Sequence, residues 1–206
     1  MTRVVADISI SLDGYVTGPD PGPANGLGDG GEALHAWAFS DDPDDQRLLR
    51  EATSRSGAVV MGRTLFDIVD GPQGWNDETG YGAGEVGTPP FVVVTRSTPE
   101  RVRLTDLDWT FVTTGLDDAV TAATEQAVRE SSRRGGDDLD VVLMGGGALI
   151  GSALAAGLVD VLSVHLAPVV LGGGTPLFAA GTRRDLSPTG AVTTSTATHL
   201  RYRVRR

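Results

Sequence analysis

The stretch that most constrains the fold runs from Val141 to Gly151, where a short apolar run is followed by three glycines and an apolar, alanine-rich segment. The apolar run predicts a buried strand, and the segment after the glycines predicts a helix. A strand, a glycine turn and a helix together bring backbone N–H groups and the positive end of a helix to an anionic phosphate. We therefore expect this turn to hold the pyrophosphate of a dinucleotide. A lone glycine triplet is also typical of a turn that packs a helix on a strand.

Composition narrows the classes of protein that this chain can form. Its 206 residues predict one domain, residues 1–206, and a net charge of -10 argues against nucleic acid or an anionic membrane as a partner. The chain contains neither cysteine nor lysine, which excludes disulfides, cysteine nucleophiles, cysteine-ligated zinc and lysine Schiff bases. It has no apolar run of membrane-spanning length and no signal-peptide core near Met1, so we expect a cytoplasmic protein.

Predicted strands and helices alternate along the chain. The strands are residues 3–12, 58–61, 91–94, 109–112, 140–144 and 160–170, and the helices are 43–55, 64–69, 117–133 and one containing 152–157. Residues 190–204 alternate and predict one or two antiparallel edge strands, residues 71–90 predict an irregular segment, and residues 18–31 predict a mobile loop long enough to cover a site. This order indicates an α/β fold with a largely parallel sheet.

Small or basic residues follow four of the predicted strands. They are Gly62-Arg63-Thr64, Thr95-Arg96-Ser97, Thr113-Thr114-Gly115 and Gly145-Gly146-Gly147. Ligands of α/β sheets bind beyond the carboxyl ends of the strands, and guanidinium groups bind phosphate through paired hydrogen bonds. We therefore expect Arg63 and Arg96, with Thr64 and Ser97, to bind a terminal phosphate monoester, the group that distinguishes NADP from NAD.

Two common phosphate-binding motifs do not fit the glycine turn. Residues 145–151 do not give G-x-G-x-x-G, because Ile150 stands where the third glycine belongs, and the turn lies late in the chain. A P-loop needs a lysine, which this chain lacks.

Four segments, in their order and spacing, resemble the dihydrofolate reductase-like superfamily: residues 13–16, 60–64, 94–97 and the turn at Gly145. Residues 157–160, 168–178 and 198–202 resemble the reductase domain of the bifunctional riboflavin-biosynthesis deaminase-reductase. The resemblance implies a three-layer α/β/α fold with a mostly parallel central sheet and an antiparallel C-terminal edge. It also implies a stand-alone NADPH-dependent reductase, commonly a homodimer. The deaminase half is missing and its zinc site cannot exist here, so we expect no metal.

The resemblance also implies where NADP(H) binds. The predicted cofactor contacts are Val16, Gly62, Arg63, Thr64, Thr95, Arg96, Ser97, Thr114, Met144, Gly145, Gly146, Gly147, Ala148, Leu149 and Ile150. Many of them are the strand-end residues that the phosphate argument selects independently.

Three side chains are candidates for the chemistry, which needs positioning and a proton source because the cofactor carries the hydride. Asp13 is expected to contact substrate or to form the turn that follows the first strand. Asp45 resembles the acid of dihydrofolate reductases that binds the pterin ring, and would then face the nicotinamide; otherwise it is a first-turn acid favoured by the helix dipole. His165 reaches the floor of the site or is a structural residue of its strand. The three histidines lie far apart in the sequence and predict no metal site.

Three functions follow from these residues and from the resemblance. The first is NADPH-dependent reduction of a small heterocyclic substrate, with a riboflavin-pathway ribosylaminopyrimidine as the first candidate. The second is reduction of a pterin, as in dihydrofolate reductase. The third is a non-catalytic NADP-binding module.

Overall fold

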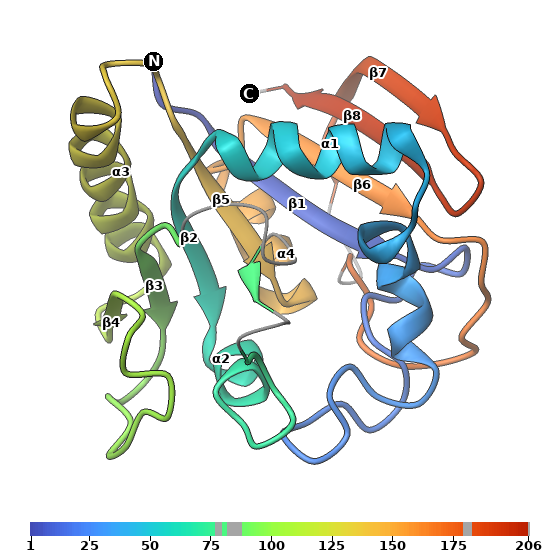
Figure 1. Ribbon diagram of the computed structural model, residues 1–206, viewed down its shortest axis with the longest axis horizontal. Helices are drawn as coiled ribbons and strands as arrows, with labels where there is room; N and C mark the ends of the chain where they lie inside the picture. Colours follow the sequence, from blue (N-terminus) through green and yellow to red (C-terminus); the bar gives the residue numbers. More distant parts are fainter. Residues whose placement is uncertain (77–79, 82–87, 179–182, 206) are drawn as a thin grey trace.

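The computed structural model describes residues 1–76, 80–81, 88–178 and 183–205. Within this part of the chain, eight strands form one sheet in the order β4-β3-β2-β5-β1-β6-β8-β7 (Figure 1). The strands are β1 Val4–Ile10, β2 Ser56–Gly62, β3 Phe91–Val94, β4 Trp109–Val112, β5 Asp140–Gly145, β6 Val161–Leu166, β7 Leu186–Thr193 and β8 Thr198–Val204.

The strands from β4 to β6 in the sheet order are parallel, and β8 and β7 add an antiparallel edge. This confirms the predicted mostly parallel sheet with an antiparallel C-terminal edge. Because parallel strands end at the same edge of a sheet, the glycine turn after β5 and the polar segments after β2, β3 and β4 share that edge.

Helices cover both faces of the sheet. The helices are α1 Pro43–Ser54, α2 Arg63–Val69, α3 Leu116–Arg133 and α4 Gly147–Ala156, and a 3₁₀ helix, η1, spans Gly31–Phe39. Apolar residues of α3 and α4 pack on one face against β1, β2 and β5, whereas Phe66 of α2 packs on the other face with Phe91 of β3. Helix α1 crosses in front of the strands in Figure 1, and its Leu49 packs with Trp37 of η1. None of the described helices is long and apolar enough to span a bilayer.

Several elements differ from the sequence expectation. Helix η1 was not predicted, because its apolar residues show no α-helical period and follow a glycine-rich loop. Strand β6 ends at Leu166, before Pro168, because proline cannot donate to a strand ladder. Strand β7 begins at Leu186 and contains Pro188, which the outer edge tolerates. Of the predicted irregular segment 71–90, residues 77–79 and 82–87 lie outside the described residues.

Alternation along β1 separates the core from the site. Ala6, Ile8 and Ile10 join the main core beside α4. Successive side chains of a strand point to opposite faces, so Asp7 and Ser9 lie on the other face, toward α1 and η1. Polar side chains are uncommon on a covered face of a central strand. Asp7 and Ser9 therefore mark this face as a candidate functional site.

Candidate active site

A cavity of about 960 Å³ lies over the face of the sheet that α1 and η1 cover. One part is lined by Gly62 to Leu65 and by Met144 to Leu149. Its polar residues elsewhere include Asp7, Ser9, His35, Ser163, His165, His199 and Arg201. The cavity therefore joins the predicted phosphate turn to a floor of acidic and imidazole groups.

The glycine turn leads directly into the N-terminus of α4, as the sequence predicts. Gly146 immediately precedes the helix, and a Cβ built on it would meet no heavy atom within 4 Å. Gly147 is packed tightly instead, since its Cβ would lie 2.7 Å from the carbonyl oxygen of Pro176 and 3.0 Å from Cγ2 of Val16. The first N–H groups of a helix have no partner within it and point out of its N-terminus. The turn thus offers N–H donors, open space at Gly146 and a rigid backing at Gly147, which fits a pyrophosphate.

Most of the predicted cofactor residues on this side meet at the cavity. Val16, Gly62, Arg63, Thr64 and the residues from Met144 to Leu149 all line it. Ile150 does not, because its side chain is fully buried in the core and its N–H donates to the carbonyl of Gly146.

The arginine predicted after β2 is held by the strand ends around it. Arg63 Nε donates to Asp67 at 2.7 Å, and its Nη1 donates to the carbonyl of Ser97 at 3.1 Å. The same Nη1 lies 3.4 Å from Thr95 Oγ1. The structure therefore brings Arg63, Thr95 and Ser97 together across the ends of β2 and β3. Arg96 is exposed beside them, and Thr114 is exposed after β4, at the far edge of the sheet.

Asp13 holds two turns together. Its carboxylate accepts hydrogen bonds from the backbone N–H groups of Leu171 at 3.1 Å and Gly172 at 2.7 Å, and from Ser11 Oγ at 2.6 Å. The Ser11 hydroxyl, helped by these N–H groups, holds the pKa of Asp13 below its usual value. These contacts tie Asp13 to the turn that begins at Ser11 and to the turn at Leu171 and Gly172, and a contact with substrate stays a prediction.

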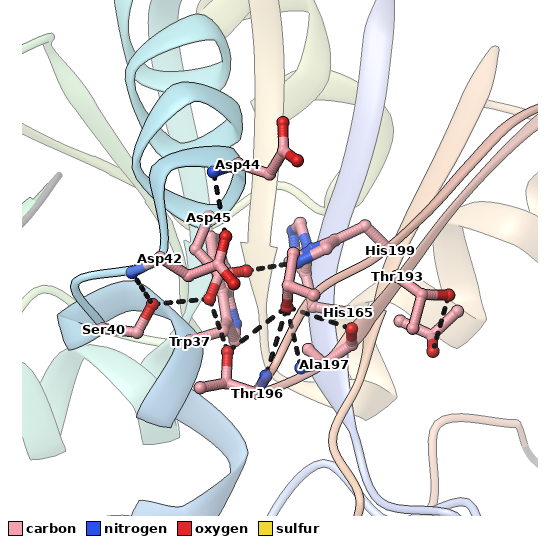
Figure 2. A network of polar contacts seen from close by, with 12 residues as sticks. Trp37, Ser40, Asp42, Asp44, Asp45, His165, Thr193, Thr196, Ala197 and His199 are labelled. Atoms are coloured by element: carbon pink, nitrogen blue, oxygen red, sulfur yellow. Dashed lines mark hydrogen bonds and ion pairs between the residues drawn. The ribbon is translucent and has the colours of Figure 1, made fainter.

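Asp7, His165, His199 and Asp45 form a continuous chain of polar contacts, which we name the acid–imidazole chain. Asp7 Oδ1 lies 2.9 Å from His165 Nε2, the two Nδ1 atoms lie 2.6 Å apart, and His199 Nε2 lies 2.7 Å from Asp45 Oδ1. Figure 2 shows its inner part, with Asp45 between α1 and β8. Among the described residues, no group of three or more His, Asp or Glu side chains is arranged to hold a metal ion.

Sheet register assembles this chain. His165 of β6 stands directly opposite His199 of the antiparallel β8, and Ser9 of β1 stands beside His165. Side chains directly opposite in an antiparallel pair lie close enough to touch. Both histidines are almost fully buried, with 4% and 6% of the surface of the whole residue exposed. Trp37 covers them, stacking on His165 with ring centroids 4.0 Å apart and donating its indole N–H to Ser9 Oγ.

Asp45 closes the inner end of the chain. It stands in the first turn of α1 but does not cap the helix, because Asp42 caps it by accepting from the N–H of Asp44 at 3.0 Å. The Asp45 side chain is fully buried, and its Oδ2 accepts hydrogen bonds from the hydroxyls of Ser40 and Thr196. Burial opposes its charge, but these hydroxyls and His199 keep its pKa below the usual value. Neither of the two alternatives for Asp45 predicted contacts with Ser40, Thr196 and His199. The position of Asp45 beside the nicotinamide stays a prediction.

The charges along the chain are coupled. Burial raises the pKa of Asp7, but the charge of His165 and its hydrogen bond outweigh burial and leave that pKa below its usual value. For His199, burial and the nearby His165 lower the pKa, against the opposing effect of Asp45. His35, with a buried Nδ1 that has no hydrogen-bond partner among the described residues, has its pKa lowered to about 4 by burial and by His165. His35 is therefore neutral at pH 7.

Sequence reasoning missed Asp7 and His199 as site residues. An acid inside a β-branched strand was a usable signal for Asp7, because buried carboxylates are rare unless they are paired. The alternation of His199 with Arg201 on β8 was visible as well, and Arg201 also lines the cavity. The sequence did not indicate which strand lies beside β8, and so it did not indicate that His199 faces His165.

Residues 2–200 match the family described as the RibD C-terminal domain. The chain belongs to this family. A comparison with curated proteins finds no match. The family match accounts for nearly the whole chain, including the glycine turn and both histidines of the acid–imidazole chain.

Solved structures show the same fold in proteins of low sequence identity. A protein assigned to riboflavin biosynthesis in Shewanella sp. PV-4 has a TM-score of 0.64 and 21% identity, with both chains fully covered. The diaminohydroxyphosphoribosylaminopyrimidine deaminase/5-amino-6-(5-phosphoribosylamino)uracil reductase of Thermotoga maritima has a TM-score of 0.60 and 14% identity, covering 99% of this chain and 57% of that one. The dihydrofolate reductase of Enterococcus faecalis, complexed with NADP(H), has a TM-score of 0.55 and 14% identity, covering 99% and 97%. The dihydrofolate reductase-like fold is thus confirmed.

Proposed function

We propose that this protein is an NADPH-dependent reductase of a small heterocyclic substrate, with a ribosylaminopyrimidine of riboflavin biosynthesis as the first candidate. The family implies an oxidoreductase, and its relatives include a uracil reductase. One observation carries the proposal: a single cavity joins the glycine turn at α4 to polar groups on the floor of the sheet. A reductase needs this arrangement, because the cofactor must place its reactive ring beside a substrate that can receive a proton.

The residues at the carboxyl ends of the strands and at the start of α4 fit NADP(H). The N–H groups at the start of α4 and the open space at Gly146 suit the pyrophosphate, and bound nicotinamide would supply the hydride. Arg63 and Arg96 are the groups that would hold a terminal phosphate. The Arg63 guanidinium lies beside Thr95 and Ser97 and donates its Nε hydrogen to Asp67, so a bound phosphate would share this guanidinium with Asp67.

The proposal is tested by titrating the protein with NADPH and NADH, with nicotinamide fluorescence as the readout. We expect NADPH to bind roughly tenfold more tightly or better, the increment that one charge-assisted phosphate contact supplies. Replacing both Arg63 and Arg96 with alanine should abolish the preference, whereas Arg101→Ala, at an exposed arginine of the loop after β3, should keep it. Equal affinity for the two cofactors, or no binding, refutes the proposal.

A turnover screen then separates the candidate substrates. NADPH oxidation with the ribosylaminopyrimidine supports the first candidate, and oxidation with dihydrofolate supports the pterin alternative. NADPH binding without oxidation across the panel favours a binding module. The pterin alternative is the weaker one, because both oxygens of Asp45 are occupied by Ser40, Thr196 and His199.

A further inference from the structure

The two histidines of the acid–imidazole chain meet through their Nδ1 atoms, which lie 2.6 Å apart. Two ring nitrogens can lie 2.6 Å apart only when one donates a hydrogen to the other, because two bare lone pairs would repel. The outer nitrogens of both rings face carboxylates, at 2.9 Å on Asp7 and 2.7 Å on Asp45, and a carboxylate is an acceptor. The four ring nitrogens therefore hold three protons when both acids are ionised. The pair carries one proton more than two neutral rings do.

The contacts around His165 favour that ring as the carrier of the additional proton. His165 stands between Asp7 and His199, so as an imidazolium it donates at both nitrogens and satisfies both contacts. Trp37 offers its ring face to His165, with the planes 25° apart, which favours a cation there. His199 is then the neutral ring that accepts at Nδ1 and donates at Nε2 to Asp45. The lowered pKa of His199 agrees with this assignment.

Other charged groups face the chain from each packed element. His35 of η1 is neutral because its pKa is lowered to about 4, so it does not compete for the proton. Arg201 of β8 lies near Asp7 and favours its ionised form. Tyr81 is partly buried, and the loss of solvent around its phenol raises the pKa of that group and keeps it neutral. These groups leave the imidazole pair as the place where the additional proton resides.

We propose that the acid–imidazole chain holds one proton and delivers it through Asp7 to the substrate atom that must be protonated when hydride is accepted. Asp7 is the exit because its side chain is 21% exposed and lines the cavity, whereas Asp45 is fully buried. The delivery step rests on the proposed reductase function. Asp7 is then the catalytic residue, and His199 and Asp45 are positioning residues that set the protonation of His165.

The step balances in atoms and charge. In a C=N or C=O substrate, the carbon gains a hydride and its electron pair, and the π electrons move to the heteroatom. The Nε2 proton of His165 moves to the ionised carboxylate of Asp7, and Asp7 passes a proton on to the heteroatom. His165 becomes neutral and keeps its Nδ1 proton toward His199. The summed charge of the four side chains of the acid–imidazole chain changes from about -1 to about -2, and solvent returns one proton before the next turnover.

The proton count is tested on the protein without cofactor, by NMR of ¹⁵N-labelled imidazoles between pH 5 and 9. We expect three of the four nitrogens of His165 and His199 to carry protons at pH 7.5. Asp45→Asn and Asp7→Asn each remove one carboxylate, and each should weaken binding of the third proton about tenfold or more, a shift of roughly one pH unit. Asp44→Asn, at an exposed neighbour on α1 paired with Arg47, should leave it unchanged.

Delivery is tested by the rate of NADPH oxidation. We expect Asp7→Asn to lower kcat by about 10² or more while NADPH binding stays intact, and Asp45→Asn to shift the pH profile of kcat toward acid. Asp44→Asn keeps the wild-type profile.

Each outcome decides a separate part of the inference. Two neutral rings at pH 7.5, or a third proton indifferent to both carboxylates, refutes the proton-holding chain, and a wild-type kcat in Asp7→Asn refutes delivery through Asp7. Wild-type protein that oxidises no NADPH refutes the reductase proposal and delivery together. The NMR result without cofactor then still decides the chain. Should Asp45→Asn not fold, the wild-type and Asp7→Asn spectra suffice.

Discussion

The Trp37 indole lies on the His165 imidazole, with ring centroids 4.0 Å apart, and donates its N–H to Ser9 Oγ at 2.9 Å. Through these contacts, one aromatic side chain of η1 covers the buried histidines and fixes η1 on the sheet. Trp37 also packs with Leu49 of α1 and Ala197 of the β7–β8 hairpin. Trp37 therefore covers the buried histidines from η1, a helix that the sequence pattern did not predict.

Trp37→Phe should cost about 1 to 2 kcal/mol of unfolding free energy, because it keeps an aromatic face but leaves the Ser9 hydroxyl without its donor. Trp37→Ala should cost about 3 to 5 kcal/mol, since it also leaves a cavity. Urea denaturation measures both. Phe39→Ala on the same helix, where the side chain is 63% exposed, serves as the control and should cost less than about 0.5 kcal/mol. A Trp37→Ala variant as stable as this control would contradict the anchoring role.

Gly147→Ala should lower stability, because its Cβ would collide with backbone at 2.7 Å and with Val16 at 3.0 Å. Overpacking of this kind costs about 1 to 3 kcal/mol, or several degrees of Tm in a protein of this size. Differential scanning calorimetry measures the change. Gly22→Ala is the matched control, since its Cβ would meet nothing within 4 Å and its φ is not positive. Equal Tm values for the two variants would show that Pro176 and Val16 can move away from Gly147 at little cost, which would contradict tight packing at this position.

Asp140→Asn should destabilise the protein at neutral pH. Asp140 accepts from Arg3 at 2.7 Å and Arg55 at 3.1 Å, and burial opposes its charge while both arginines lower its pKa. The expected cost is about 2 to 3 kcal/mol, below that of a fully buried pair because the arginines are 41% and 48% exposed.

The Asp140 effect has a defined pH dependence. A carboxyl with a lowered folded-state pKa contributes stability above its unfolded pKa, about 3.9, and the contribution is lost as pH falls through the folded value. The gap between wild type and Asp140→Asn in urea denaturation should therefore close as pH approaches 2. Asp137→Asn, at an exposed neighbour, should show no gap at any pH. A gap that persists in acid would mean that packing, and not charge, causes the loss.

His35→Phe should make the protein less sensitive to acid. His35 has a folded-state pKa of about 4 and an unfolded value of 6.5, so between these values the unfolded chain takes up a proton that the folded one does not. Wild-type stability should fall by up to about 3 kcal/mol from this group as pH drops from 6.5 to 4, and the variant should lack this part of the loss. Denaturation at pH 7.5 and 4.5 measures it, and parallel losses in the two proteins would contradict the neutral state of His35.

Local pattern determined most elements of this fold. The runs at residues 91–94 and 109–112 are strands with the predicted bounds, and residues 43–55 differ from α1 by one residue. Their hydrophobic period and their capping residues are properties of neighbours in sequence. Helix η1 is different, because its apolar residues lack that period and only burial of Leu34 and Trp37 identifies its inner face.

The candidate site likewise has one part that local sequence determined and another part that only the tertiary structure assembled. The sequence by itself determined the glycine turn at Gly145, because a strand, a turn and a helix follow one another within a few residues. It selected Asp45 and His165 singly, and it could not join them. Only the tertiary structure brought His165 to His199, because the register of β8 on β6 sets that contact across 34 residues, and α1 must pack over both strands before Asp45 can complete the chain.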